Sequence, residues 1–334
     1  MIRYGILGFG LHAVRRLMPG FALARNSRVT ALSRRDMEKA RASAAEYHIP
    51  HAFDSAADLC RSTEVDAIFV ATPNACHLRD VLLAIEHKKP VLCEKPMGMN
   101  AAECRQMVEV ARRANVLLGV AQVFRFENSV AILRDRIAAG QVGRPLYARS
   151  EFCYPGRSHP RKWLFDPALA GGGPIADVGV HCVDALRCIL NDEVVRVAAR
   201  DISTEQSGEL EAAALLSLEF SRGTLGSVFV SATSEYRTPL EIVGDAGSLR
   251  GDDALNVDRP LTLELRQGGK VVETHNVSNA DAYARQVDEF SAAIEAVRPF
   301  PAPGEEGWQN QEILDAAYRS LKSGKTETVP LVVR

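Results

Sequence analysis

Two polar clusters in this 334-residue chain have residue types suited to proton transfer. In the first, an apolar run ends abruptly in Glu94-Lys95-Pro96, although lysine and glutamate are seldom buried unless they are paired. In the second, a glycine-rich stretch leads to Asp177 and His181, which at i and i+4 share one face of a helix. Histidine titrates near neutrality and suits general acid–base work, whereas a neighbouring ammonium group stabilises negative charge that develops on oxygen.

The composition is that of an ordinary soluble globular protein. Apolar residues make up 46% of the chain and charged residues 25%, and at about 150 residues per domain the length predicts two domains. The net charge of −2 provides no field suited to nucleic acid or anionic lipid, so neither partner is expected. No stretch approaches the roughly 18 uncharged apolar residues of a membrane helix, and the N-terminus lacks the pattern of a signal peptide.

The cysteines indicate the cellular compartment. The chain has seven of them, an odd number with irregular spacing and without a CxxC pair, which argues against a disulfide framework or a zinc ribbon. We therefore expect a reduced, cytoplasmic protein that holds no metal.

The first 122 residues alternate short apolar runs with amphipathic segments. Runs that are apolar on both faces are typical of parallel strands covered by helices. The alternation predicts a doubly wound α/β sheet, that is, a dinucleotide-binding Rossmann domain over residues 1–122. The expected strands are 4–7, 29–32, 67–71, 91–93 and 116–120, and the expected helices are 36–47, 74–88 and 101–115.

The pattern changes after residue 122, where strand-like runs follow one another with short turns. This pattern predicts a second domain of the α+β class over residues 123–334, with a mostly antiparallel open sheet. The expected strands are 145–154, 194–202, 212–220, 224–231, 239–243 and 261–266, and the expected helices are 129–139, 174–190, 280–296 and 305–323.

The first strand runs into a G-x-G-x-x-A turn that opens a helix. In such a turn Gly8 permits the tight bend, Gly10 lets the backbone approach a pyrophosphate, and Ala13 allows close packing of helix and sheet. The amides at the helix N-terminus then face the phosphates. Between a strand and a helix, the motif predicts a dinucleotide site. Its predicted cofactor-binding residues are Gly8, Phe9, Gly10, Leu11 and His12.

The end of the second strand bears on the choice between NAD and NADP. An NAD site usually has Asp or Glu there, about 20 residues after the glycine turn. Here the strand ends in Ser33-Arg34-Arg35, and no acid precedes Asp36. Ser33 can donate a hydrogen bond to a 2′-phosphate, and either arginine can clamp it and stack on adenine. We predict NADP, with NAD as the alternative if this is simply a solvated basic turn.

Four motifs occur in a fixed order along nearly the whole chain. The GFGLHA turn is followed by ATPN at 71–74 with His77, by EKP at 94–96, and by GGGPIADVGVHCVD at 171–184. Together they resemble the glucose–fructose oxidoreductase / inositol dehydrogenase / MocA (Gfo/Idh/MocA) family. EKP combined with the G-G-G-x-x-x-D-x-G-x-H-x-x-D stretch is far more specific than the glycine turn alone.

The resemblance implies roles for these residues. Lys95 would be the catalytic lysine, with a cis Lys95–Pro96 bond that projects it over the crevice beyond the strand ends, where doubly wound folds bind ligands. Asp177 and His181 would face the same crevice from the second domain. The remaining implied contacts with the dinucleotide are Glu94 near the nicotinamide ribose, Thr72, Pro73 and Asn74 along the cofactor, His77 on the helix behind, and Gln122 near the nicotinamide.

For interconversion of an alcohol and a ketone, we assign His181 as general acid/base and Lys95 as polariser and proton-relay partner. Asp177 would orient the histidine or bind substrate. The lysine could instead be the base, and the residues alone do not separate these two roles.

Three further residues are predicted to bind substrate. Arg125 lies where relatives carry an arginine near the domain junction, and an interdomain salt bridge is an equal alternative. Trp163 falls where relatives often have Trp-Arg, but here Leu164 follows it. Tyr154, with Arg157 and His159, could reach a sugar, although a solvated loop is the alternative there.

The leading hypothesis is an NADP(H)-dependent oxidoreductase that transfers a hydride to or from a secondary alcohol or ketone of a sugar or cyclic polyol. CVDALR at 182–187, followed by LND at 190–192, is similar to the anhydrofructose reductase branch. That similarity favours ketose or sugar-lactone chemistry, with inositol and dihydrodiol dehydrogenases as close alternatives. Two different functions would also fit the motifs: that of a relative that keeps its dinucleotide tightly bound, including certain glycosidases, and that of a non-catalytic dinucleotide sensor.

The resemblance also implies self-association, because relatives commonly pair through the outer face of the second domain's open sheet. The runs 212–220 and 224–231 are apolar enough to bury both faces of that sheet. They contain Leu216, Leu218, Val228 and Val230. We therefore expect a homodimer or homotetramer, unless helices of the same subunit cover that face.

Overall fold

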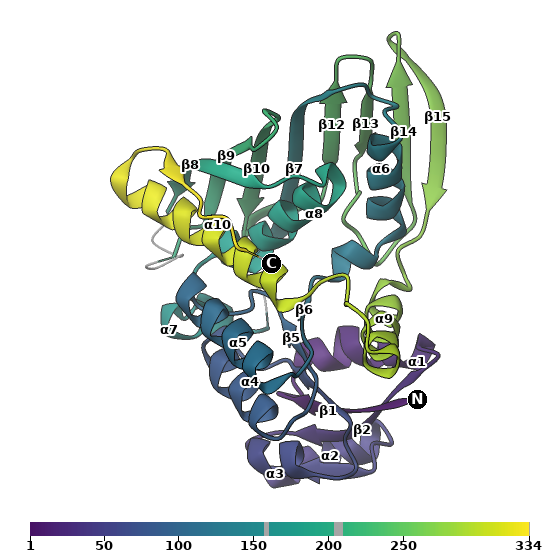
Figure 1. The fold of residues 1–334 in the computed structure, drawn as a ribbon, viewed down its shortest axis with the longest axis vertical. Helices are drawn as coiled ribbons and strands as arrows, with labels where there is room; N and C mark the ends of the chain where they lie inside the picture. The colour runs from purple at the N-terminus through teal and green to yellow at the C-terminus, as the bar shows by residue number, and fades with distance from the viewer. Residues whose placement is uncertain (157–159, 204–209, 334) are drawn as a thin grey trace. The chain divides into compact units, whose positions relative to one another are not determined.

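The computed structural model describes residues 1–156, 160–203 and 210–333 (Figure 1). The chain divides into two compact units. Met1–Val123 and Tyr283–Trp308 make up the first, whereas Phe124–Ala282 and Gln309–Arg334 make up the second. Within the described residues, every helix is too short or too polar to span a bilayer.

The first unit is built on a six-stranded parallel sheet with the order β3-β2-β1-β4-β5-β6. The expected doubly wound fold is confirmed, since this is the Rossmann order. The strands have almost no polar side because helices flank both faces, and all four residues of β4 are buried. The strands are β1 (Ile2–Leu7), β2 (Ser27–Ser33), β3 (His51–Phe53), β4 (Ala67–Val70), β5 (Val91–Glu94) and β6 (Leu118–Ala121).

The helices of this unit begin and end on residues that local chemistry favours. Asp36 accepts a hydrogen bond from the Lys39 amide at the start of α2, and Asn100 does the same for Glu103 at the start of α5. The helices are η1 (Ala13–Leu17), α1 (Met18–Leu23), α2 (Met37–Glu46), α3 (Ala56–Arg61), η2 (Asn74–Cys76), α4 (His77–Glu86), α5 (Ala101–Ala114) and α9 (Ala282–Ala296).

The expected domain limits need a correction, because they placed all of residues 123–334 in the second domain. Tyr283–Trp308 instead packs with the first unit. The Tyr4 hydroxyl on β1 lies 2.8 Å from Ser291 Oγ on α9, and the Val120 amide on β6 donates to the Ala302 carbonyl at 2.9 Å. The late segment therefore covers β1 and pairs part of the open edge of β6, which the first 122 residues leave uncovered.

The second unit holds a ten-stranded sheet in which β7 pairs in parallel with β10 and all other pairs are antiparallel. The predicted α+β class is confirmed. Four strands were not predicted, namely β11, β13, β15 and β16, because they are short or carry too many polar residues for a clear apolar pattern. The strands are β7 (Pro145–Pro155), β8 (Val194–Ile202), β9 (Ala213–Phe220), β10 (Leu225–Ser231), β11 (Thr233–Arg237), β12 (Leu240–Gly244), β13 (Ser248–Gly251), β14 (Leu261–Gln267), β15 (Lys270–Val277) and β16 (Glu327–Thr328).

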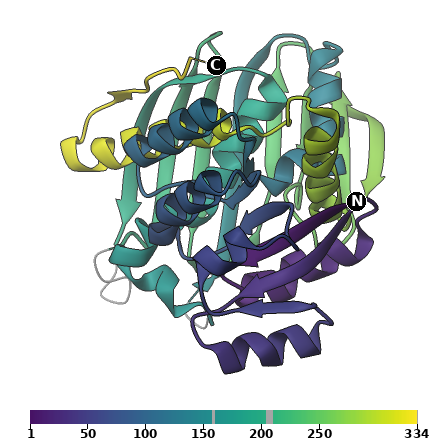
Figure 2. The same cartoon turned by 60° about the horizontal axis from the view of Figure 1, so that its bottom comes forward.

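Helices α6 and α8 lie on the same face of this sheet (Figure 1, Figure 2). The side-chain alternation of β9 and β10 matches that arrangement. Leu216, Leu218, Val228 and Val230 are buried, whereas Leu215 and Leu225 on the opposite face are exposed. The remaining helical segments are η3 (Val123–Phe126), α6 (Asn128–Ala138), η5 (Lys162–Phe165), α7 (Pro167–Ala170), η6 (Ile175–Gly179), α8 (Val180–Leu190) and α10 (Gly304–Ser323).

Candidate active site

The glycine turn follows β1 and has the geometry that the motif requires. Gly8 has φ +83°, and a Cβ there would lie 2.7 Å from the Thr72 amide nitrogen, so only glycine fits. A Cβ on Gly10 would meet no protein atom closer than 3.9 Å. The fold itself therefore does not demand glycine at position 10, which is consistent with a backbone kept open for a ligand.

The flanking residues of this turn divide between core and surface. The Phe9 side chain is buried against the Tyr47 ring, and its amide donates to the Ser33 carbonyl at 3.1 Å. Leu11 and His12 are partly exposed. The hydrogen bond from Phe9 holds the ends of β1 and β2 together, so the glycine turn and the Ser33 turn lie side by side.

His12 makes a contact that sequence reasoning did not anticipate. Its Nε2 lies 2.8 Å from Oε1 of Glu94, at the end of β5. Burial raises the pKa of Glu94, but the His12 ring and the neighbouring Lys95 and His77 outweigh it and hold the pKa below its ordinary value. Glu94 is therefore ionised at neutral pH, and it links the glycine turn to the E-K-P segment.

Lys95 is half-buried directly after β5. Its backbone amide donates to Glu94 Oε2 at 3.3 Å, and the Lys95–Pro96 peptide bond is cis, as expected. The lysine thus begins a turn at the carboxyl end of a central strand of the parallel sheet, where doubly wound folds place their ligands.

His77 is fully buried at the start of α4 and contacts two backbone carbonyls. Its Nδ1 lies 2.9 Å from the Pro96 oxygen and its Nε2 lies 2.9 Å from the Thr72 oxygen. Burial lowers the pKa of His77, while the two carbonyls and the carboxylates of Glu94 and Asp80 oppose that change. Both ring nitrogens are therefore engaged. His77 is better placed to support the turns that contain Thr72 and Pro96 than to contact a dinucleotide directly.

The remaining residues of the T-P-N motif are also held in place. The Thr72 hydroxyl donates to Asp80 at 2.8 Å, and the Asn74 side chain is buried. Pro73 is partly exposed between them. The contact of this turn with the dinucleotide stays a prediction.

The basic turn after β2 has one anchored and one exposed arginine. Arg34 is partly buried and donates from Nη1 to Ser43 Oγ at 2.7 Å, whereas Arg35 is exposed. Ser33 is buried, and Asp36 is used as the N-cap of α2. The nearest acid is therefore committed to the helix, and the turn retains its positive charge.

Gln122 follows β6 and is almost completely buried. Neither its Oε1 nor its Nε2 has a hydrogen-bond partner among the described residues. An unsatisfied buried amide costs about 1–3 kcal/mol. The contact of Gln122 with a nicotinamide stays a prediction.

In the second unit, Asp177 and Tyr154 are direct partners. The Tyr154 hydroxyl donates to Asp177 Oδ2 at 2.8 Å. Burial, together with the carboxylate, raises the pKa of Tyr154 well above its ordinary value, so the phenol stays protonated and remains the donor. Tyr154 therefore fixes the orientation of Asp177, a contact that was not deduced from the sequence.

His181 lies near the start of α8 and packs against aromatic rings. Its ring stacks on Phe124 with centroids 4.3 Å apart and lies 6.2 Å from Phe152. The side chain is nearly buried. Asp177 belongs to the preceding π-helical turn η6, so the two residues occupy consecutive helical segments and not one regular α-helix.

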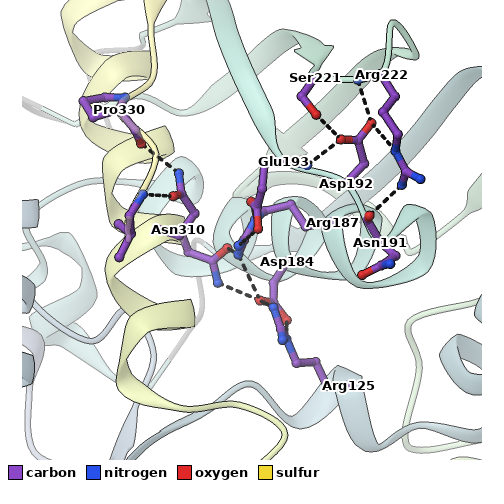
Figure 3. Close-up of polar contacts among 12 residues, drawn as sticks. Arg125, Asp184, Arg187, Asn191, Asp192, Glu193, Ser221, Arg222, Asn310 and Pro330 are labelled. Atoms are coloured by element: carbon purple, nitrogen blue, oxygen red, sulfur yellow. Dashed lines mark hydrogen bonds and ion pairs between the residues drawn. The ribbon is translucent and has the colours of Figure 1, made fainter. Parts of the chain in front are cut away.

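Arg125 pairs with Asp184 of α8 through two hydrogen bonds, from Nε at 2.8 Å and from Nη2 at 2.7 Å (Figure 3). Asn310 of α10 donates to the same carboxylate at 2.7 Å and accepts from Arg187. Arg187 also forms a two-point pair with Glu193. This buried network ties η3, α8 and α10 together within the second unit. It favours a structural role for Arg125, and its contact with substrate stays a prediction.

We predict that Asp184→Asn lowers the free energy of unfolding by about 3 kcal/mol, because it leaves two nearly buried guanidinium groups without their shared carboxylate. Urea unfolding measures the change. Asp253→Asn, which breaks an exposed pair with Arg259, is the control and is expected to change stability by less than about 1 kcal/mol. Equal effects of the two substitutions would show that the network adds nothing to an ordinary surface pair.

Trp163 is the remaining residue that was predicted to bind substrate. Trp163 is part of η5, and the Arg161 guanidinium lies 6.0 Å from its ring centroid. Arg157 and His159 lie outside the described residues.

Comparisons with known proteins place these features in a family. Residues 2–122 match the oxidoreductase family with an NAD-binding Rossmann fold, and residues 130–250 match the GFO/IDH/MocA C-terminal domain. The chain is 31% identical to 1,5-anhydro-D-fructose reductase from Ensifer adhaerens, over 92% of each chain. The chain belongs to the Gfo/Idh/MocA family.

Two other similar proteins align with almost the whole chain. It is 29% identical to D-xylose 1-dehydrogenase (NADP(+)) 2 from Haloferax volcanii, over 96% of this chain and 98% of the relative. It superposes on the aldose-aldose oxidoreductase from Caulobacter crescentus, crystallised with glycerol, with a TM-score of 0.90 and 25% identity over 98% and 99% of the chains. The chain is accordingly an NAD(P)-dependent oxidoreductase that acts on CH–OH groups of sugars or polyols.

The two catalytic side chains predicted from the family motifs lie in different units. Lys95 belongs to the first and His181 to the second. Their action on one substrate therefore stays a prediction. Among the described residues, no three His, Cys, Asp or Glu side chains gather in a way that could hold a metal ion.

Proposed function

We propose that this family member transfers a hydride between NADP and a secondary alcohol or ketone of a sugar or cyclic polyol, with a ketose or sugar lactone as the preferred oxidised substrate. The single observation that carries the proposal is the coincidence of an open glycine turn with Lys95 at the end of β5 in the same unit. The 31% identity to a 1,5-anhydro-D-fructose reductase supports the sugar class.

The residues of the first unit fit a nicotinamide dinucleotide. The space over Gly10 would admit the pyrophosphate, and the unsatisfied Gln122 amide would bind the carboxamide end. Glu94, ionised and held by His12, would accept a hydrogen bond from a ribose hydroxyl. When bound, the dinucleotide supplies a ring that accepts or returns a hydride.

The remaining chemistry belongs to the side chains of this chain. In alcohol oxidation, His181 takes the hydroxyl proton as the hydride leaves carbon, and in ketone reduction it returns that proton. Lys95 stabilises the negative charge that develops on the substrate oxygen. Asp177, held by Tyr154, orients the imidazole or binds a neighbouring hydroxyl of the substrate.

A substrate panel tests the proposal. Purified protein is mixed with NADPH and a series of ketoses, lactones and anhydroketoses, and with NADP⁺ and sugars, inositols and dihydrodiols, while the nicotinamide absorbance is followed. We expect turnover with at least one sugar or sugar derivative. No turnover with any sugar, polyol or diol would contradict the proposal.

The preference for NADP rests on Ser33, Arg34 and Arg35. We predict that the Arg34→Ala/Arg35→Ala double variant weakens NADPH binding about 10- to 100-fold, because charge-assisted hydrogen bonds are each worth about 1.5–3 kcal/mol, and leaves NADH binding nearly unchanged. Fluorescence titration with both nucleotides measures the ratio. Arg113→Ala, which removes an exposed arginine of α5, is the control. An unchanged NADPH-to-NADH ratio in the double variant would favour NAD.

One different function has support from a specific likeness. The match to an aldose-aldose oxidoreductase favours an enzyme that keeps its dinucleotide and oxidises one sugar while reducing another. In that case the purified protein retains stoichiometric nucleotide through dialysis. A nucleotide-free preparation would favour an enzyme that releases NADP after each reaction. A preparation that binds nucleotide without any turnover would indicate a sensor.

We also propose that the protein is a cytoplasmic homodimer or homotetramer. The exposed face of the ten-stranded sheet carries Leu215, Leu225 and Tyr147, each at least 36% exposed. Leu225 lies directly opposite Tyr147 in the sheet, and contiguous exposed apolar side chains mark interaction surfaces. Sedimentation velocity tests the assembly, and a monomer at micromolar concentration would contradict it.

A further inference from the structure

The turn that precedes Asp177 and His181 is held by a carboxylate from a distant part of the chain. Glu211 lies just before β9, and its Oε2 accepts the Gly173 amide at 3.1 Å while its Oε1 accepts the Ile175 amide at 2.9 Å. The Tyr318 hydroxyl of α10 donates to the same Oε1 at 3.0 Å. Three donors therefore converge on one side chain that is 7% exposed.

Glu211, together with Tyr318, anchors this turn, and the close contact of this anchor requires glycine in the turn. A Cβ on Gly172 would overlap the Tyr318 hydroxyl, and a Cβ on Gly173 would lie 2.9 Å from the Glu211 carboxyl carbon. The close approach of Glu211 and Tyr318 thus explains why two consecutive glycines stand at this point. A larger residue at either glycine would therefore displace Glu211 or Tyr318.

The hydrogen bonds that Glu211 accepts favour its ionised form, whereas its burial opposes ionisation. Burial raises the pKa of Glu211, and the amides and the Tyr318 hydroxyl counter part of that rise by stabilising the ionised form. Burial and the carboxylate raise the pKa of Tyr318 well above its ordinary value, so it remains a donor. An ionised carboxylate can satisfy all three donors at once, whereas a glutamine would present an amide hydrogen to one of them.

We propose that Glu211 and Tyr318 are positioning residues that fix where the consecutive helical segments η6 and α8, which carry Asp177 and His181, begin. The inference rests on the proposed function of those two side chains. Asp177 follows Ile175 by two residues, and its amide donates to the Gly173 carbonyl at 2.9 Å. Any shift of the turn is therefore passed directly to Asp177 and to its hydrogen bond with Tyr154.

The other end of α8 supplies a matched control. The Asp192 carboxylate, also nearly buried, accepts the Glu193 amide at 2.9 Å, the Ser221 hydroxyl and the Arg222 amide at 3.1 Å (Figure 3). Like Glu211 it accepts three uncharged donors, and it also pairs with the Arg222 guanidinium, whose Nε lies 3.4 Å from its Oδ2. It supports the end of the helix that lies away from Asp177 and His181.

The experiment compares Glu211→Gln, Tyr318→Phe and Asp192→Asn in the full-length protein with the sugar substrate found in the panel. We expect Glu211→Gln to lower kcat about 10- to 100-fold, because small misplacements of reacting groups have effects of that size, with KM for NADPH unchanged. Tyr318→Phe should give a smaller loss of kcat. Asp192→Asn should lower Tm by about as much as Glu211→Gln does, but it should keep kcat within about twofold of the wild type.

Hydrogen exchange separates failure of this inference from failure of the proposed function, since it needs no turnover. Glu211→Gln should speed amide exchange in peptides that cover residues 173–181, and Asp192→Asn should not. If Glu211→Gln does not fold, Tyr318→Phe provides the same comparison. Unchanged exchange in that segment, or a loss of kcat in Asp192→Asn equal to that in Glu211→Gln, would overturn the positioning role. A wild type without any turnover, but with the expected exchange, would overturn only the assigned chemistry.

Discussion

Replacing Lys95 by methionine is expected to lower kcat about a thousandfold while NADPH binds almost as tightly as before. The ammonium group stabilises charge that exists only in the transition state, and removal of such a group typically reduces kcat by about 10²–10³-fold or more. The backbone of this segment is held by Glu94, which accepts the Lys95 amide, and by His77, which contacts the Pro96 carbonyl, so the turn should keep its form. Steady-state rates and a fluorescence titration of NADPH measure the two quantities.

A matched substitution shows whether the effect is specific. Lys270 stands at the start of β15 and is exposed, so Lys270→Met removes an ammonium group without touching either motif. Its kcat should stay within about twofold of the wild-type value. If Lys95→Met weakens NADPH binding by the same factor as it lowers kcat, the lysine holds the cofactor and does not serve the chemical step.

His181→Asn should slow turnover about a thousandfold and should change the pH dependence. Loss of a general acid or base typically reduces the rate by about 10²–10⁴-fold. In the wild type, alcohol oxidation needs a neutral imidazole to accept the proton and ketone reduction needs an imidazolium to return it, so the two rates should depend on pH in opposite directions. In the variant both dependences should disappear, which rate profiles in the two directions measure.

His275→Asn is the control for this experiment, because His275 is a partly exposed histidine of β15 that pairs with Glu273. It should leave both the rate and the pH profile unchanged. The same profiles decide between the two candidate bases. If His181→Asn keeps the pH dependence and Lys95→Met loses it, the lysine transfers the proton and the histidine only binds substrate.

The sequence could predict features that depend on a few neighbouring residues. A tight turn after β1 requires glycine at position 8, where φ is positive and the Thr72 backbone leaves no room for a Cβ. Continuous apolar runs such as Ala67–Val70 suit a strand covered on both sides. The β3 strand escaped prediction because its three residues, His51–Phe53, are only partly buried and follow a proline.

Features that join distant segments could not be predicted, since no local pattern records the partner of a side chain. His12 meets Glu94 across 82 positions, and Glu211 meets Tyr318 across 107. For Arg125 the sequence left a substrate contact and an interdomain salt bridge equally open, and only the structure shows that its guanidinium pairs with Asp184 of the same unit. Each of these pairings depends on which elements the fold brings together.

By itself, then, the sequence determined the Rossmann turn, the position of Lys95 after a buried strand and the family. Glycine, proline and apolar periodicity determine the backbone conformation over a few neighbouring residues, so their effect does not depend on the rest of the fold. Only the tertiary structure decided that Tyr283–Trp308 completes the first unit and that Glu211 holds the turn before His181. Those choices follow from burial and hydrogen bonding between segments far apart in the chain, where many competing partners of the same residue type exist.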